Sequence, residues 1–328
     1  MEKARPALTE RGRVCYTEKM RCLFVYNPVS GKGKVGRCEG EIAEALSRRF
    51  GACDVYATRA PGELSEKAAD ACGRYDVLVF AGGDGSFNEV VQGLGERENR
   101  PVLGYIPTGT VNDIARSVGI PRSIRGALKN IVDGAPKRLD VMKVNDSYVM
   151  YVVASGGLTG CSYTAGQSSK KAFGKLAYAF EVLRRDLVID DYTFRFEDNN
   201  EIHEAAAVMA MIMNSRSVAS MRLNPDAVLD DGEVELVIIT QEKLKHETNF
   251  FRHVRYLLSA LGVFVLGYRG LKYDPRAFVY RGNRFKIGVG DDIVWNFDGE
   301  RGISGPIELT VLPRHVELIV PERERQRK

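Results

Sequence analysis

The sequence predicts an α/β domain followed by a β-rich domain with inserted helices. Residues 21–137 alternate short apolar or β-branched runs with helical stretches, a pattern typical of βα units that build a parallel sheet. Beyond Pro136 the apolar runs are longer and alternate with polar residues, which is typical of antiparallel strands. The 328 residues are 44% hydrophobic and 27% charged, so the composition excludes a disordered, fibrous or collagen-like chain.

The first domain has the pattern of a compact, doubly wound sheet. Strands are expected at residues 23–26, 54–58, 76–81 and 102–106, and helices at 35–49, 63–74, 86–94 and 111–118. Ligands of such sheets bind at the carboxyl ends of the strands. The Gly-rich and polar motifs of this sequence all fall at those ends.

The second domain is expected to be mostly antiparallel. Its strands are predicted at residues 138–144, 148–154, 192–196, 206–213, 234–240, 285–289, 294–297 and 307–312, with helices near 173–185 and 244–266. Residues 1–20 are polar and lack an apolar core segment, so we expect a disordered extension. The predicted organisation is therefore an extension at 1–20, an α/β domain at 21–137, a β-rich domain at 138–321 whose end returns toward the first domain, and a charged tail at 322–328.

Charge, cysteines and hydropathy narrow the class of protein. The net charge of +4 is too balanced to imply nucleic-acid binding. None of the six cysteines forms a C-x-x-C pair and no signal peptide precedes them, which favours reduced thiols in a cytoplasmic protein. The longest apolar run, residues 256–268, is shorter than the roughly 20 residues of a membrane-spanning helix.

The first motif, 27–33 (NPVSGKG), joins a predicted strand to a predicted helix. Gly31 and Gly33 allow the backbone to turn with its N–H groups outward, where they and the helix N-terminus can hold phosphate oxygens. Lys32 would add a positive charge. The spacing is not that of a P-loop, and a tight turn without a ligand explains the same residues.

The second and third motifs occupy equivalent places after the third and fourth predicted strands. In 81–89 (AGGDGSFNE), three glycines bring the backbone close to a ligand and Asp84 stands at a helix start, although N-capping alone also explains an acid there. In 107–113 (PTGTVND), Thr110 and Asn112 can form hydrogen bonds to a nucleotide. Asp113 adds a second carboxylate, and two acids beside a phosphate-binding loop suit Mg²⁺ held mainly through water.

Taken together, N-P-x-S-G-x-G, G-G-D-G-[ST]-x-N-E-V and P-x-G-T-x-N-D-x-A-R resemble the diacylglycerol kinase catalytic-domain family, in its soluble bacterial lipid kinase branch. The resemblance continues through 213–239 and the triplet 298–300 (DGE), and covers about residues 21–321. It implies nucleotide binding between an α/β domain and a β-sandwich domain. It also implies ATP-dependent transfer of the γ-phosphoryl group to a lipid hydroxyl, most directly that of diacylglycerol, giving phosphatidic acid in phospholipid biosynthesis.

The resemblance also assigns roles to individual residues. Asp84 and Asp113 would position the catalytic Mg²⁺ through water, and Glu300 would be the general base that accepts the proton of the attacking hydroxyl. Without the resemblance, Glu300 is simply an acid in a polar turn. The nucleotide would be lined by the three motifs and the end of the second strand: Asn27, Pro28, Val29, Ser30, Gly31, Lys32, Thr58, Gly83, Asp84, Gly85, Ser86, Phe87, Asn88, Glu89 and Thr110.

A second metal position follows from the same resemblance. The side chain of Asp231 with the carbonyls of Val228 and Glu233 would bind a structural Mg²⁺. A plain hairpin turn at Asp231-Gly232 explains the same residues.

The expected partner is a lipid substrate at a membrane surface, with no nucleic acid and no transmembrane segment. The segment 244–266 carries apolar residues at helical spacing with basic residues nearby, which fits either a surface that docks on anionic lipid or a helix packed as core. A homodimer is compatible with the sequence, which determines neither the oligomeric state nor the lipid. The alternatives are a kinase of another acceptor, such as a sphingoid base or NAD, or a nucleotide-binding regulator without catalysis. The intact Asp84, Asp113 and Glu300 argue against a regulator.

Overall fold

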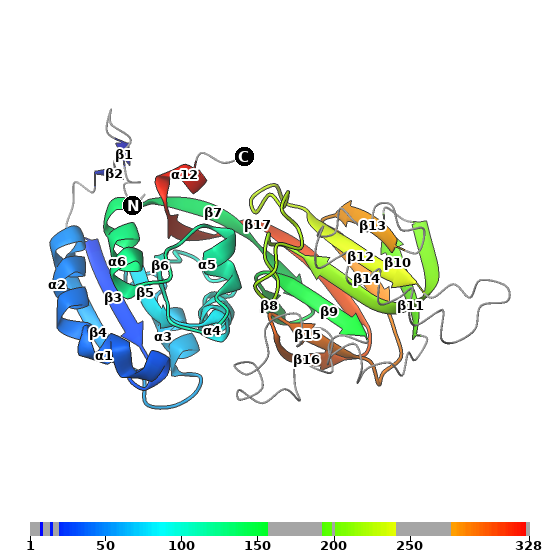
Figure 1. Ribbon diagram of the computed structural model, residues 1–328, viewed down its shortest axis with the longest axis horizontal. Helices are drawn as coiled ribbons and strands as arrows, with labels where there is room; N and C mark the ends of the chain where they lie inside the picture. The colour runs from blue at the N-terminus through cyan, green and yellow to red at the C-terminus, as the bar shows by residue number, and fades with distance from the viewer. Residues whose placement is uncertain are drawn as a thin grey trace. The chain divides into compact units, whose positions relative to one another are not determined.

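The computed structural model describes residues 7–8, 14–15, 20–156, 192–198, 201–240 and 277–325, and the chain divides into two compact units. Unit 1 comprises Met1–Val141 and Pro313–Lys328, and unit 2 comprises Met142–Leu312. Two strands, β7 (Ala135–Val144) and β17 (Ile307–Val320), contribute residues to both units (Figure 1). The predicted helices at 173–185 and 244–266, with the basic amphipathic segment, lie outside the described residues.

Unit 1 is built on a parallel sheet with the order β4-β3-β5-β6. These strands are β3 (Met20–Tyr26), β4 (Gly51–Ala57), β5 (Val77–Gly82) and β6 (Val102–Pro107). The central strand β5 is buried at every residue, as expected of a parallel strand covered on both faces. The returning strand β17 extends the sheet, because Leu318 pairs in parallel with Leu103.

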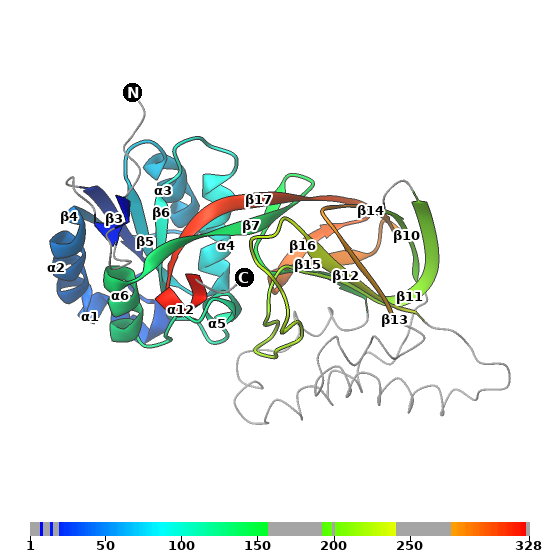
Figure 2. The same cartoon turned by 90° about the horizontal axis from the view of Figure 1, so that it is seen from above.

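Helices cover both faces of this sheet. They are α1 (Lys34–Arg37), α2 (Glu39–Phe50), α3 (Glu63–Ala71), α4 (Asp84–Leu94), α5 (Asp113–Ser117) and α6 (Ile124–Asp133). α2 packs beside α6, and α3 packs beside α4 (Figure 2). The chain runs from β3 outward to β4 and then back past β3 to β5 and β6. Because right-handed crossovers in opposite directions lie on opposite faces of a sheet, α2 and α3 cover different faces. The predicted doubly wound α/β architecture is therefore confirmed.

Two helical predictions for unit 1 were incomplete. The single helix expected at 35–49 is two helices, because the backbone leaves the helical region at Cys38, where φ is −107° and ψ is 6°. The helix α6 was not predicted, although its start has a recognisable signal: the Ser123 side chain accepts a hydrogen bond from the Gly126 N–H at 3.2 Å. A short terminal helix, α12 (Glu322–Arg325), also lies in the segment expected to be a charged tail. In the expected extension, Ala7–Leu8 pairs with Val14–Cys15.

Unit 2 is a set of antiparallel strands. They are β8 (Ser147–Val149), β9 (Val152–Gly156), β10 (Tyr192–Asp198), β11 (Glu201–Met213), β12 (Val234–Thr240), β13 (Ala277–Gly282), β14 (Arg284–Gly288), β15 (Val294–Phe297) and β16 (Glu300–Ser304). The bounds of β12 and β15 coincide with the prediction. The strand expected at 148–154 is two strands that are separated at Met150 and Tyr151, and β13 and β16 were not predicted.

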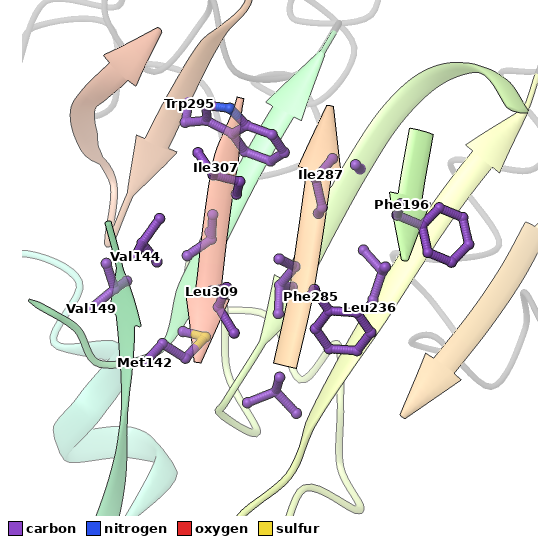
Figure 3. Packing of buried hydrophobic residues seen from close by; sticks show 14 of the residues in the cluster. Met142, Val144, Val149, Phe196, Leu236, Phe285, Ile287, Trp295, Ile307 and Leu309 are labelled. Atoms are coloured by element: carbon purple, nitrogen blue, oxygen red, sulfur yellow. The ribbon is translucent and has the colours of Figure 1, made fainter. Parts of the chain in front are cut away.

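The core of unit 2 is a single apolar cluster contributed by several strands (Figure 3). Trp295 is fully buried in it, and its indole N–H donates to the Gly305 carbonyl at 2.8 Å. Phe194 packs edge-on against Trp295 with ring centroids 6.4 Å apart. Among the residues that the structure describes, none of the helices has the length and apolar character required to span a membrane.

Candidate nucleotide-binding site

The three predicted motifs begin at one edge of the unit 1 sheet. They follow β3, β5 and β6, which are neighbours in the parallel sheet. Tyr26 pairs with Ala81, and Gly82 pairs with Pro107, so the strands end at matching positions. The Thr108 N–H continues this alignment by donating to the Gly82 carbonyl at 2.7 Å. The carboxyl edge of the sheet therefore brings all three motifs together, as the sequence predicted.

The first motif is a compact turn with its own hydrogen bonds. The side-chain oxygen of Asn27 accepts from the Val29 N–H at 3.0 Å, and the Asn27 carbonyl accepts from the Ser30 N–H at 3.1 Å. Residues Ser30–Gly33, Lys32 included, form a short 3₁₀ helix, with φ of +59° at Gly31 and +67° at Gly33. Asn27, Pro28 and Val29 are exposed.

Thr58 lies beside the first motif, at the end of β4. Its N–H donates to the Tyr26 carbonyl at 2.9 Å, and its hydroxyl lies 3.5 Å from the same oxygen. The predicted nucleotide residue Thr58 therefore adjoins the start of the first motif, since Asn27 follows Tyr26 directly.

The three motifs approach one another closely at glycine positions. A Cβ atom on Gly31 would lie 3.1 Å from the Thr108 Cβ, and a Cβ on Gly109 would lie 2.6 Å from the Gly83 Cα. A side chain at Gly109 would therefore force the second and third motifs apart. The glycines leave a surface on which backbone N–H groups can approach a ligand closely.

Asn112 fixes the third motif from within. Its φ is +54° and it is buried. Its side-chain oxygen accepts from the Gly109 N–H at 3.0 Å, and its amide nitrogen donates to the Gly109 carbonyl at 2.7 Å. The sequence suggested a contact with nucleotide for Asn112, but the structure uses its amide to shape the loop. Thr110 is exposed, and its carbonyl accepts from Arg122 at 2.8 Å.

The two predicted acids interact at this edge. Asp113 is fully buried, and the Asp84 carboxylate accepts from the Ile114 N–H at 3.2 Å. Burial raises the pKa of Asp84, and the negative charge of Asp113 raises it further, while N–H groups at the start of α5 act in the opposite direction. A cation would relieve this repulsion, and carboxylate oxygens are the donors that Mg²⁺ prefers. The residues present therefore fit Mg²⁺.

Two hydroxyls in the motifs also fit a phosphate ligand. The Ser30 and Thr108 hydroxyl oxygens are buried and have no hydrogen-bond partner among the described residues. Buried polar atoms are normally paired, so an unpaired hydroxyl beside a Gly-rich turn suits a phosphate oxygen or water. Thr108 was not among the predicted site residues. Its position directly after a strand, one residue before a glycine, was the available signal.

The remaining residues of the second motif lie in the first turns of α4. Phe87 is an exception among the predicted nucleotide residues, because its ring is fully buried and packs edge-on against Phe80 and Tyr105, with centroid distances of 5.3 and 5.2 Å. It supports the helix from the core side. Gly85, Ser86, Asn88 and Glu89 are partly exposed.

The other predicted site residues belong to unit 2. Glu300 is exposed and begins β16, directly after the turn at Asp298 and Gly299. The acidic turn near Asp231 contacts Arg281. The guanidinium lies against the Asp231 carboxylate, 2.9 Å from a Glu233 oxygen and 3.9 Å from a Glu235 oxygen. Asp231 also accepts from the Glu233 N–H at 3.1 Å.

Arg281 thus gives the acidic turn a cation from the protein itself. Val228 lies three residues before Asp231 and is partly buried. Among the residues that the structure describes, no cluster of three or more His, Cys, Asp or Glu side chains has the arrangement of a metal site. A structural Mg²⁺ at Asp231 stays a prediction.

Comparison with known proteins identifies the family. Residues 21–144 match the model of the diacylglycerol kinase catalytic domain, and residues 152–320 match that of the YegS C-terminal NAD kinase beta sandwich-like domain. The chain belongs to the diacylglycerol kinase family. Two relatives named diacylglycerol kinase, from Staphylococcus haemolyticus and Staphylococcus aureus (strain MRSA252), are 33% and 34% identical to it. The alignments cover 91% and 92% of this chain and 88% and 93% of the relatives.

A solved structure supports the fold of this family member. A putative diacylglycerol kinase from Bacillus anthracis is 22% identical, with a TM-score of 0.77, and the match covers 94% of this chain and 97% of that chain. The α/β plus β-sandwich class expected from the sequence is therefore confirmed, and the chain is a lipid kinase by family.

Proposed function

We propose that this lipid kinase transfers the γ-phosphoryl group of ATP to the free hydroxyl of diacylglycerol and forms phosphatidic acid. The observation that carries the proposal is the meeting of the three Gly-rich motifs at one sheet edge, where the Ser30 and Thr108 hydroxyls have no hydrogen-bond partner within the described part of the chain. Such an edge suits phosphate groups, because backbone N–H groups and helix N-termini point toward a ligand there.

Each predicted residue has a role in this reaction. The predicted nucleotide residues, apart from the buried Phe87, would bind ATP through backbone and hydroxyl groups. Asp84 and Asp113 would hold Mg²⁺, which would neutralise charge on the phosphates. Glu300 would accept the proton of the lipid hydroxyl while the oxygen bonds to the γ-phosphorus and the bond to ADP breaks. Positioning and charge neutralisation are the main sources of catalysis in phosphoryl transfer.

We also propose a structural Mg²⁺ at Asp231, with the carbonyls of Val228 and Glu233. Arg281 offers a competing explanation for the same acids, since its guanidinium already pairs with them. Peripheral membrane association and a homodimer are further expectations. The segment that would dock on lipid lies outside the described residues.

The acceptor is tested by transfer from radiolabelled ATP to a panel of diacylglycerol, monoacylglycerol, sphingosine, phosphatidylglycerol and NAD. We expect labelled phosphatidic acid as the main product. Labelled sphingosine phosphate would move the assignment to a sphingoid base, and labelled NADP without labelled lipid would overturn the lipid assignment.

A further inference from the structure

Asp298 is a buried acid that the proposed reaction does not use directly. Asp298 is 3% exposed, and its carboxylate accepts hydrogen bonds from three backbone N–H groups. One carboxylate oxygen accepts from Met150 at 2.7 Å, and the other accepts from Tyr151 at 2.8 Å and from Val152 at 3.0 Å. These donors lie 146 to 148 residues away in the chain.

The backbone of Asp298 is bonded to the same segment. Its N–H donates to the Val152 carbonyl at 2.9 Å, and its carbonyl accepts from the Tyr151 hydroxyl at 2.7 Å. Asn214 pairs with the carbonyl groups of the same segment. Its side-chain amide donates to the Met150 carbonyl at 3.2 Å, and its backbone N–H donates to the Tyr151 carbonyl at 3.0 Å. Buried polar groups of the segment are thus paired from two directions.

Glu300 is two residues from this junction. Phe297 pairs with Glu300 across a two-residue hairpin turn, in which φ is +53° at Asp298 and +89° at Gly299. Positive φ at both central residues is the requirement of a type I′ turn, which favours Asn-Gly as well as Asp-Gly. The Gly299 N–H also donates to the Asn296 side-chain oxygen at 2.9 Å. The hairpin therefore begins at a residue whose carboxylate and backbone bond to residues 150–152, where β9 starts.

The turn alone does not explain the carboxylate. Asn would adopt the same backbone conformation. Its NH₂ group, however, would face one of the backbone N–H groups that donate to the Asp298 carboxylate, and two donors cannot pair. A carboxylate has two acceptor oxygens and can receive all three donors. We infer that Asp298 is a positioning residue for Glu300: its carboxylate ties the Asp-Gly-Glu hairpin to Met150, Tyr151 and Val152. This inference rests on the proposed role of Glu300 as the base.

The test compares Asp298→Asn, Glu300→Gln and the double variant in steady-state transfer from MgATP to diacylglycerol. We expect Asp298→Asn to lower kcat about 100-fold, the loss that a small displacement of a catalytic group can cause, without changing the dissociation constant of ATP. In the Glu300→Gln background the same change should cause no further loss, because residues that act as a unit are not additive. The inference would be overturned if Asp298→Asn kept the wild-type kcat. It would also be overturned if Asp298→Asn lowered kcat by the same factor in the wild type and in Glu300→Gln.

Two variants separate positioning from a loss of stability. Phe285→Leu removes core packing in the same unit. It should keep the wild-type kcat even where its melting temperature falls as much as that of Asp298→Asn. Tyr151→Phe keeps the carboxylate and removes one hydrogen bond to Asp298, so kcat should fall by up to about 10-fold. If kcat fell equally in Phe285→Leu and Asp298→Asn, the role of Asp298 would be to stabilise unit 2 and not to position Glu300.

Hydrogen exchange gives a readout that does not depend on the acceptor. The amides of Met150, Tyr151 and Val152 should be protected in the wild type and exchange at least about 10-fold faster in Asp298→Asn, as expected when a buried hydrogen bond is lost. Unprotected amides in the wild type would overturn the inference. Protected amides in a wild-type protein that phosphorylates no lipid would instead count against the proposed function.

Discussion

Gly83 and Gly109 lie so close together that a Cβ atom on Gly109 would come within 2.6 Å of the Gly83 Cα. The two residues belong to loops after different strands, β5 and β6. Their contact turns two separate Gly-rich motifs into one continuous backbone surface at the sheet edge. This surface is the part of the site that a nucleotide phosphate would meet.

Gly109→Ala should therefore weaken ATP binding. The added methyl group would also lie 2.8 Å from the Asn112 side-chain oxygen, so the third motif would have to move away from the second. Overpacking of this kind costs about 1–3 kcal/mol, which corresponds to a loss of affinity of roughly 5- to 150-fold. Isothermal titration calorimetry measures the affinity of each variant for ATP.

Gly40→Ala is the matched control for this change. A Cβ on Gly40 would meet nothing within 4 Å, and Gly40 lies inside helix α2. Alanine is favoured over glycine in a helix by about 1 kcal/mol, so this variant should keep its affinity and gain stability. Equal ATP affinity in Gly109→Ala and the wild type would contradict the close packing of the two loops.

Asp84→Asn should raise stability at neutral pH while it removes activity. Burial and Asp113 raise the pKa of Asp84 in the folded state. Stability contributed by an acid with a raised pKa is present below its unfolded pKa of about 3.9 and is lost as pH rises through the folded value. The asparagine side chain does not ionise, so the variant does not lose stability in this way as the pH rises. Its free energy of unfolding should exceed that of the wild type at pH 7, and the difference should close toward pH 4.

Urea denaturation between pH 4 and pH 8 measures the difference. Asp70→Asn, which removes an exposed carboxylate from α3, should keep the wild-type transfer activity. A variant Asp84→Asn that is less stable than the wild type at every pH would show that the Ile114 hydrogen bond outweighs the burial of the charge.

Glu300→Gln should strongly reduce transfer while ATP still binds. A general base contributes about 100- to 10,000-fold to the rate, so kcat should fall by a factor in that range. The dissociation constant of ATP should be unchanged, because the variant keeps all the nucleotide motifs of unit 1. Glu308→Gln, an exposed acid paired with Arg284, is the control. Near-normal turnover of Glu300→Gln would remove it as the base.

Arg281→Gln should weaken unit 2. Asp231 and Glu233 would lose their shared cation, and exposed ion pairs of this kind contribute about 0.2–1 kcal/mol each. Trp295 is the one tryptophan of the chain and is buried in the core of unit 2, so its fluorescence reports the unfolding of that unit. An unchanged unfolding midpoint would show that the ion pairs contribute nothing measurable.

Chelation tests the proposed metal at Asp231 by the same fluorescence signal. If Mg²⁺ binds there, EDTA should lower the unfolding midpoint of unit 2, and the effect should persist in Asp84→Asn. No change with EDTA would count against that metal and would leave Arg281 as the cation of the turn.

The sequence predicted the features that depend on local pattern. Strands β12 and β15 were placed with their observed bounds, because alternating or continuous apolar runs report burial directly. The Gly-rich motifs were placed at strand ends, because glycines and polar residues mark turns with special backbone angles. Helix α6 was not predicted, because a capping serine such as Ser123 is equally typical of a turn.

By itself, then, the sequence determined the two-part fold class, the three motifs and the family. The tertiary structure decided how polar groups far apart in the chain are paired. The strand expected at 148–154 is interrupted because the N–H groups of Met150 and Tyr151 bond to Asp298, and Asp231 pairs with Arg281, 50 residues away. Residue periodicity reports which side of an element is buried, but the partner of a buried donor or charge depends on which distant segments the fold brings together.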